Sequence, residues 1–419
     1  MLDGLADDAC VHPALDVFAR FARLGVTSFG GPVAHLGYFR REFVERAAWL
    51  DDEAYGEIVA LCSVLPGPTS SQVGIALGAR RAGPLGALLA WVGFTLPSAA
   101  VMAALGVAFN AARGAGAGAG ALAAASLRGP FLALQGVAAA VVLAAVLAMA
   151  KSLLTSRFAY AVAAASFAAA LALDARAPGF AWTILVAAGI AGAIAAPPAA
   201  ALPSGSAFGR VPRAAGIGAA VLFVFGIAVL PALAGANEEA ALFATCFRAG
   251  SLVFGGGHVV LPFLQTLVAS GRVDSDRFLA GYGLVQAVPG PLFTFAAFLG
   301  AADVRLAHAP LAGAAAALAG IFAPSFLLLA MVAPLWGRLR ALPRAARVIG
   351  ALGAAVVGLL AAVFVTPVAS SIATAPVALA IAVLAFALLR VARWPSWAVV
   401  LAGAAAGALA QAARIPGAG

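Results

Sequence analysis

Long apolar segments, separated by short polar links, account for most of the chain. Runs such as 85–109, 131–150 and 311–334 reach the roughly 20 residues that a helix needs to cross the hydrocarbon core of a bilayer. The pattern predicts an all-α polytopic membrane protein with about 10–13 transmembrane or re-entrant helices. The candidate segments are 14–34, 56–79, 85–112, 130–150, 157–173, 180–202, 214–235, 240–263, 278–300, 309–335, 347–366, 374–390 and 396–412.

The polar interruptions of these segments occur twice, in the same order. Arg23 is followed by a Phe-Gly-Gly element and then by Pro-Gly-Pro, and Arg248 is followed by the same two elements. Further on, Pro97-Ser98 corresponds to Pro324-Ser325. Arginine, glycine and proline are unfavourable inside an apolar helix, so their repetition predicts two homologous halves. We expect these halves at residues 1–202 and 214–419, joined by a linker at 203–213.

The arginines between the segments predict an orientation. Cytoplasmic loops carry an excess of Lys and Arg, so the basic link at 338–347 is expected in the cytoplasm, and counting segments places Arg80 and Arg81 there as well. The count gives the two repeats opposite directions through the membrane, as in many secondary transporters. One link disagrees, because the arginines at 40–46 fall outside. We interpret this link as an amphipathic helix at the membrane surface.

Composition agrees with a membrane protein. The chain is 64% hydrophobic and 10% charged, with a mean hydropathy of +1.05, whereas a soluble domain carries about 25% charged residues. The net charge of +9 comes mostly from arginines in the links, which favours positive-inside topology over a nucleic-acid surface. The three cysteines have no metal-like spacing.

The two repeated arginines are candidates for binding an anion. Arg23 and Arg248 each lie well inside an apolar segment that contains no nearby carboxylate. A guanidinium in the middle of a span costs about 2.5–3.5 kcal/mol on insertion scales, and an anionic substrate would supply the missing partner. The alternative is that both arginines mark helix ends or donate to backbone carbonyls.

The repeated Gly and Pro elements predict breaks in the helices. A helix that restarts after Pro-Gly-Pro presents free N–H groups, a positive dipole end and, in the first half, several hydroxyls, which together suit an anion. The alternative is that these residues provide kinks and close helix packing. With the two arginines, the candidate substrate-binding residues are Arg23, Ser28, Gly30, Gly31, Pro66, Gly67, Pro68, Thr69, Ser70, Ser71, Gln72, Arg248, Gly255, Gly256, Gly257, Pro289, Gly290, Pro291 and Thr294.

Three ionisable residues are candidates for coupling transport to protons. His35 and His258 follow the two Phe-Gly-Gly elements, and Glu57 begins an apolar segment. Histidine titrates near neutral pH, and intramembrane carboxylates often carry protons. The alternative is a hydrogen-bonded histidine or a carboxylate in a loop.

No catalytic or nucleotide-binding motif occurs in the sequence. The P-loop, His-Glu-x-x-His and G-x-S-x-G patterns are all missing. We therefore expect no enzyme activity, no catalytic residues, no metal site and no cofactor.

The motifs resemble those of the chromate ion transporter family. The resemblance rests on Gly25-Val-Thr-Ser-Phe-Gly-Gly-Pro-Val-Ala-His-Leu-Gly-Tyr-Phe-Arg-Arg-Glu-Phe-Val44, Pro66-Gly-Pro-Thr-Ser-Ser-Gln72 and Ser251-Leu-Val-Phe-Gly-Gly-Gly-His-Val-Val-Leu-Pro262. It covers both halves and is typical of a long-chain, two-domain bacterial member.

The resemblance implies efflux of chromate across the bacterial inner membrane by a multi-pass transporter, giving chromate resistance. The alternatives are transport of sulfate, molybdate or another oxyanion, and an anion channel. The expected partners are the oxyanion and membrane lipids, without nucleic acid, and a homodimer is left open.

Overall fold

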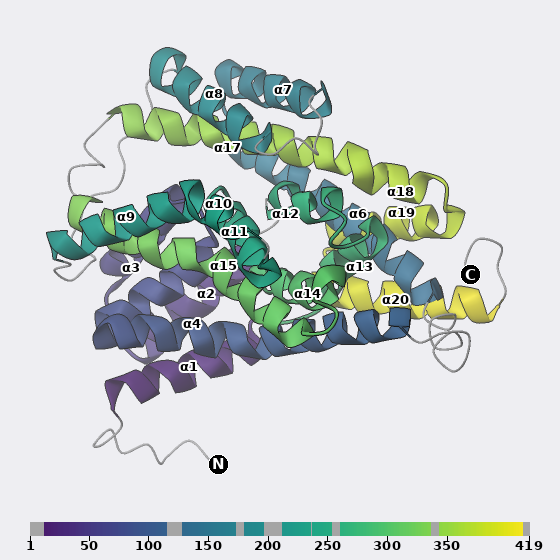
Figure 1. Ribbon diagram of the computed structural model, residues 1–419, viewed down its shortest axis with the longest axis horizontal. Coiled ribbons are helices and arrows are strands. Elements are labelled where there is room, and N and C mark those ends of the chain that lie inside the picture. The colour runs from purple at the N-terminus through teal and green to yellow at the C-terminus, as the bar shows by residue number, and fades with distance from the viewer. Residues whose placement is uncertain are drawn as a thin grey trace.

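A computed structural model describes residues 12–114, 128–172, 180–196, 212–235, 237–253, 260–336 and 343–413. These residues fold into helices and connecting loops, and they contain no strand (Figure 1). Helices satisfy their own backbone hydrogen bonds, which a bilayer requires. Four stretches are long and apolar enough to cross a membrane, at Thr69–Ala111, Gly129–Leu153, Pro310–Leu335 and Ala346–Thr366. Large side chains such as Ile194, 77% exposed, point outward. The chain is an all-α membrane protein, as predicted.

The described helices divide between the two halves. The first half contains α1 (Pro13–Thr27), α2 (Gly31–Phe39), the π-helical turn η1 (Arg40–Arg46), α3 (Asp52–Val64), α4 (Thr69–Gly114), α6 (Arg128–Leu153), α7 (Arg157–Ala172) and α8 (Phe180–Ala195). The second contains α9 (Arg213–Ala228), α10 (Leu230–Leu233), α11 (Glu238–Gly250), α12 (Val260–Ala269), α13 (Ser275–Val285), η3 (Leu292–Thr294), α14 (Phe295–Ala302), η4 (Val304–Leu306), α15 (Pro310–Val332), η5 (Ala333–Leu335), α17 (Pro343–Val363), η6 (Phe364–Ala369), α18 (Ser370–Ala373), α19 (Pro376–Arg390) and α20 (Ser396–Ala412).

Helix α4 consists of two arms that fold back on each other. Gly83 has a φ of +64°, which is unfavourable for residues with a side chain, and it reverses the chain there. The arms touch at two glycines, since a Cβ on Gly78 would lie 2.3 Å from the carbonyl oxygen of Gly86. We call residues 69–81 the short arm and residues 84–114 the long arm. Helices α14 and α15 form the equivalent pair, with Gly300 against Gly313.

The two halves are interlocked. Helix α6 packs against α19 and α20, and α17 packs against α7 and α8 (Figure 1). These contacts correspond pairwise: a Cβ on Gly136 would lie 2.4 Å from the carbonyl oxygen of Ala378, and one on Gly358 would lie 2.2 Å from that of Ala163. Each long helix therefore lies against the last two helices of the other half, and small residues allow this close approach.

Each half gathers its ion pairs at one end. In the first half, Arg20 pairs with Asp16 and Glu42 at 2.6 and 2.8 Å, and Arg81 lies 3.9 Å from Asp16. We call this the first charged end.

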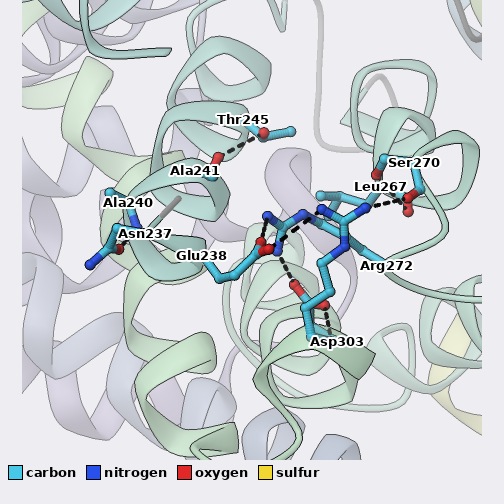
Figure 2. Close-up of polar contacts among 10 residues, drawn as sticks. Asn237, Glu238, Ala240, Ala241, Thr245, Leu267, Ser270, Arg272 and Asp303 are labelled. Atoms are coloured by element: carbon cyan, nitrogen blue, oxygen red, sulfur yellow. Dashed lines mark hydrogen bonds and ion pairs between the residues drawn. The ribbon is translucent and has the colours of Figure 1, made fainter. Parts of the chain in front are cut away.

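The equivalent end of the second half is held by Arg272. Its guanidinium contacts Asp303 at 2.5 Å and also pairs with Glu238, as Figure 2 shows. Asp303 is 1% exposed, so this ion pair is buried. We call it the second charged end.

The two charged ends lie on opposite sides of the molecule. The long arm begins three residues after Arg81 at the first charged end. Near its other terminus, Asn110 donates to the carbonyl oxygen of Ala301 at 3.3 Å, two residues before Asp303. The arm covers about 40 Å between these contacts, at 1.5 Å per residue, which exceeds the roughly 30 Å hydrocarbon core. This is the inverted arrangement that the repeats predict.

The first two candidate segments, 14–34 and 56–79, are re-entrant and not continuous crossings, which is one of the two predicted possibilities. Helix α1 stops at Thr27, because Gly30 and Gly31 have φ values of +103° and +77° and break the helix. The chain turns back through α2 and η1 until Glu42 meets Arg20. The segment with Arg40, Arg41 and Arg46 therefore lies at the same end as Arg81, and not on the opposite side. These three arginines therefore no longer contradict the rule that cytoplasmic loops carry the excess of Lys and Arg.

Helix α3 and the short arm form a second re-entrant pair. Arg81, after the short arm, lies 5.3 Å from the ring of Trp49, just before α3. In the second half, the backbone N–H of Val304, after α14, donates to the carbonyl oxygen of Arg272, before α13, at 2.9 Å. Both hairpins thus enter and leave at one end, and both turn at a Pro-Gly-Pro sequence inside the protein. The predicted spans 240–263 and 278–300 are interrupted in the same way.

Candidate functional site

The two Pro-Gly-Pro loops cross over to the opposite half. The N–H of Gly67 donates to the carbonyl oxygen of Val253 at 2.6 Å, and the N–H of Gly290 donates to that of Ser28 at 3.0 Å. Gly67 and Gly290 are equivalent in the repeat, as are Ser28 and Val253, so the two hydrogen bonds are related by a pseudo-twofold axis. We call them the first crossing (Gly67 to Val253) and the second crossing (Gly290 to Ser28).

Both crossings require glycine. Gly67 and Gly290 have φ values of +122° and +103°, a region that residues with a side chain rarely adopt. A Cβ on Gly67 would lie 2.5 Å from Nε2 of Gln72 and 3.0 Å from Oγ of Ser325. A Cβ on Gly290 would lie 2.8 Å from Oγ of Ser98. At both of these predicted helix breaks, the glycine backbone therefore lies in close contact with polar side chains.

A helix begins directly after each crossing. The short arm starts at Thr69, and η3 with α14 starts at Leu292. Such a start carries free backbone N–H groups and the positive end of the helix dipole. In the short arm, the first turn also contains Ser70, Ser71 and Gln72, all at most 3% exposed. The arrangement suits an oxyanion.

The loop before the short arm is braced by side chains. Nε2 of Gln72 donates to the carbonyl oxygen of Pro66 at 2.6 Å. Nδ1 of His35 lies 3.3 Å from Oγ of Ser70, and the imidazole packs edge-on against Phe94. Helix α2 thus contacts the start of the short arm directly.

Several buried polar atoms around the crossings have no hydrogen-bond partner among the described residues. A buried polar atom left unpaired costs about 1–3 kcal/mol, so a group of them in one region marks a place where a polar ligand can bind. The unpaired atoms in this part of the chain are Oγ of Ser28, Nε2 of His35, Oε1 of Glu57, Oγ of Ser71, Oε1 of Gln72, Nε1 of Trp91, Oγ1 of Thr95, Nε2 of Gln286 and Oγ of Ser325.

No described polar contact joins Arg23 or Arg248 to these unpaired atoms. Arg23 is on the exposed face of α1 with Val26. Arg248 is half-buried, and its Nε donates to the carbonyl oxygen of Ile227 in α9 at 3.0 Å. Arg248 therefore pairs with a backbone carbonyl, which is the predicted alternative to an anionic substrate.

The remaining predicted residues fall into two groups. His35 and Glu57 are 1% and 5% exposed, so both lie inside the protein as proton carriers would. Oγ1 of Thr294 donates to the carbonyl oxygen of Pro291 at 2.8 Å, so this hydroxyl is already used. Gly255, Gly256, Gly257 and His258 lie outside the described residues.

Two buried hydroxyls were not among the predicted site residues. Thr95 and Ser325 lie in the long arm and in α15 and are at most 1% exposed. The repeated Pro-Ser pairs are a sequence signal for Ser325, which follows Pro324. Thr95 has no repeated partner and so no such signal. Within the described ranges, no three His, Cys, Asp or Glu side chains come together as a metal site would require.

Comparison with known proteins gives matches over both halves. The pattern of the chromate transporter family matches residues 15–193 and 240–408. A chromate transport protein of Pseudomonas aeruginosa is 30% identical over 317 residues, 74% of this chain and 70% of the relative. One of Cupriavidus metallidurans is 29% identical over 393 residues, 92% and 90% of the two chains.

A probable chromate transport protein of Synechococcus elongatus is 29% identical over 333 residues, 77% of each chain. No solved structure matches the chain. The family pattern covers most of the sequence, including both Pro-Gly-Pro loops. The chain therefore belongs to the chromate transporter family.

Proposed function

We propose that this chain is a secondary active transporter that exports chromate across the inner membrane and so confers chromate resistance. The observation that carries the proposal is the short arm, a half-helix that starts inside the protein with buried hydroxyls in its first turn. Discontinuous helices whose N-termini face the binding site are typical of secondary transporters that bind anionic groups. The relatives named as chromate transport proteins support chromate among the possible oxyanions.

The substrate would bind at the crossings, midway between the two charged ends. Tetrahedral oxyanions accept several hydrogen bonds, and the hydroxyls of Ser70 and Ser71 with the free N–H groups of the short arm supply donors. The remaining predicted residues of both Pro-Gly-Pro loops would shape the backbone around the ion. Arg23, uncovered on α1, would attract the anion toward the site through its charge.

The membrane potential favours export. A dianion that leaves a cytoplasm with a negative potential gains about 2.3 kcal/mol per charge per 100 mV. Coupling to protons would add to this, and the buried His35 and Glu57 are the described residues placed to carry them. We propose the same role for His258 from its place in the sequence.

The charge distribution supports a cytoplasmic location for the first charged end. This end carries six arginines, at positions 20, 40, 41, 46, 80 and 81, beside six carboxylates. The second charged end carries only three, Arg272, Arg277 and Arg305, beside five carboxylates. Loops rich in arginine remain in the cytoplasm. In this orientation, the anion enters between α1 and α3 and leaves toward the second charged end.

Chromate accumulation in everted inner-membrane vesicles tests the proposal. Their cytoplasmic face points outward and respiration makes their interior positive, so export is measured as uptake. We expect saturable uptake that sulfate inhibits and that collapse of the potential abolishes, and growth on chromate that depends on the protein. Vesicles that take up no chromate above a protein-free control, or that only release it, would contradict the proposal.

A further inference from the structure

The two crossings are equivalent in position but not in chemistry. Most of the buried polar residues near the crossings in the first half have an apolar residue at the equivalent position of the second half. Ser28 corresponds to Val253, His35 to Val260, Ser70 to Phe293, Gln72 to Phe295 and Thr95 to Phe322. The counterparts that the structure describes, from Val253 to Phe322, are all buried among apolar side chains. The backbone of the two crossings is thus pseudo-symmetric, whereas the side chains around them differ in polarity between the two halves.

Three unpaired polar atoms belong to residues at the first crossing or in the helix turn that follows it. Oγ of Ser71, Oε1 of Gln72 and Oγ of Ser325 belong to residues that are 2%, 0% and 0% exposed, without partners in the described part of the chain. The Cβ position of Gly67 lies within 3.0 Å of both the Gln72 side chain and the Ser325 hydroxyl. The amide of Gln72, from the short arm, and the hydroxyl of Ser325, from α15, therefore approach the same loop.

At the second crossing the equivalent groups are already used. Oγ1 of Thr294, equivalent to Ser71, donates to Pro291 at 2.8 Å, and Oγ of Ser98, equivalent to Ser325, donates to the carbonyl oxygen of Thr95 at 3.1 Å. Phe295 takes the place of Gln72 and packs edge-on against the ring of Phe278. These three residues have the contacts of a structural joint, whereas the unpaired Oγ of Ser28 and Oγ1 of Thr95 beside this crossing belong to the first half.

From this difference we propose that each chain binds one tetrahedral oxyanion, on the first-half side of the crossings, through neutral donors. The hydroxyls of Ser71 and Ser325 and the free N–H groups of the short arm hold the ion, and Gln72 keeps the loop in place through Pro66. Ser98, Thr294 and Phe295 at the second crossing support the fold and contact no ion. The inference rests on the proposed function for its substrate class, but it assigns the site to particular residues.

Neutral donors suit a transported dianion. Hydroxyl hydrogens rotate to follow a ligand or to pair with one another when it leaves, so the site does not leave a buried charge uncompensated after release. Hydrogen bonds to a charged group are worth about 1.5–3 kcal/mol each. Removal of one hydroxyl should therefore weaken binding about tenfold or more.

Equilibrium binding of radiolabelled chromate and sulfate to the purified, detergent-solubilised chain tests the inference. We expect saturation at one ion per chain and a loss of affinity of about tenfold or more in Ser71→Ala and in Ser325→Ala. Ser98→Ala is the matched control for Ser325, and Ser63→Ala, an exposed serine whose hydroxyl already donates to Val59, is the control for Ser71. Both controls should bind within about twofold of the unsubstituted chain. Size-exclusion profiles check that each variant is folded.

The outcomes separate this inference from the proposed function. Two ions per chain, normal affinity in Ser71→Ala and Ser325→Ala, or an equal loss in Ser98→Ala would overturn the inference even if the chain exports chromate. Binding with the expected pattern in a chain that moves no chromate across vesicles would overturn the proposed function alone. Absence of any oxyanion binding by the unsubstituted chain would overturn both.

Discussion

Substitution of Gly67 by alanine should damage the first crossing in two ways. The backbone there has a φ of +122°, and holding a residue with a side chain in such a region costs about 1–3 kcal/mol. The new Cβ would also lie 2.5 Å from Nε2 of Gln72. That amide must move, which breaks its hydrogen bond to Pro66 and costs about another 1 kcal/mol. We expect a loss of roughly 2–4 kcal/mol in the stability of the folded state.

Gly271→Ala is the matched control for the backbone strain. Gly271 also has a positive φ, +72°, but a Cβ there would meet no atom within 4 Å. This substitution should cost about 1–2 kcal/mol and leave transport unchanged. The difference between the two variants then measures the contact with Gln72. The double variant Gly67→Ala with Gln72→Ala removes that contact and should regain part of the lost stability.

Thermal unfolding in detergent and chromate uptake in vesicles provide the two measurements. The buried Cys62 and Cys246 react with a thiol-specific fluorophore only as the protein unfolds, in a Cys10→Ser background. We expect Gly67→Ala to unfold at a clearly lower temperature than Gly271→Ala and to lose chromate uptake. Equal unfolding temperatures together with full uptake by Gly67→Ala would refute the reasoning about the crossing.

Five further substitutions test other parts of the account. Arg272→Met leaves a buried carboxylate unpaired and should destabilise the protein by about 3–5 kcal/mol, whereas Arg305→Met, at an exposed pair, should cost less than about 1 kcal/mol; a similar fall in unfolding temperature for both would contradict the burial argument. Glu57→Gln should remove the stimulation of chromate transport by a pH gradient while chromate binding persists, and unchanged stimulation would exclude Glu57 as the proton carrier. Arg23→Ala should lower the rate of chromate uptake with little change in unfolding temperature. Arg248→Ala, measured beside it, should mainly lower the unfolding temperature, because it loses the hydrogen bond to α9. Normal uptake by Arg23→Ala would contradict the proposed role of Arg23.

The sequence predicts the helix breaks well, because they depend on local chemistry. Gly30, Gly31 and Gly67 adopt backbone conformations that favour glycine, and their repetition signals two related halves. Whether an apolar segment crosses the bilayer or turns back inside the protein is not a local property. Both kinds of segment are apolar, so hydropathy alone does not distinguish a crossing from a re-entrant segment at 14–34 and 56–79.

The interlocking of the halves also lies beyond sequence reasoning. It depends on contacts such as Gly136 with Ala378, between residues far apart in a chain full of glycine and alanine. The role of Arg248 is similar: its position in an apolar segment predicts a partner, but only the packing of α9 identifies that partner as the Ile227 carbonyl. Ser325 becomes a candidate only when the first crossing brings it to Gly67.

Chromate flux into proteoliposomes under an imposed potassium diffusion potential tests the central claim most directly. The account predicts saturable uptake that accelerates when the interior is positive, that sulfate slows, and that the Ser71→Ala, Ser325→Ala double variant lacks, while Ser98→Ala keeps it. A rate of chromate uptake that does not depend on the membrane potential, or a full rate in the double variant, would contradict a transport site at the crossing of the two halves.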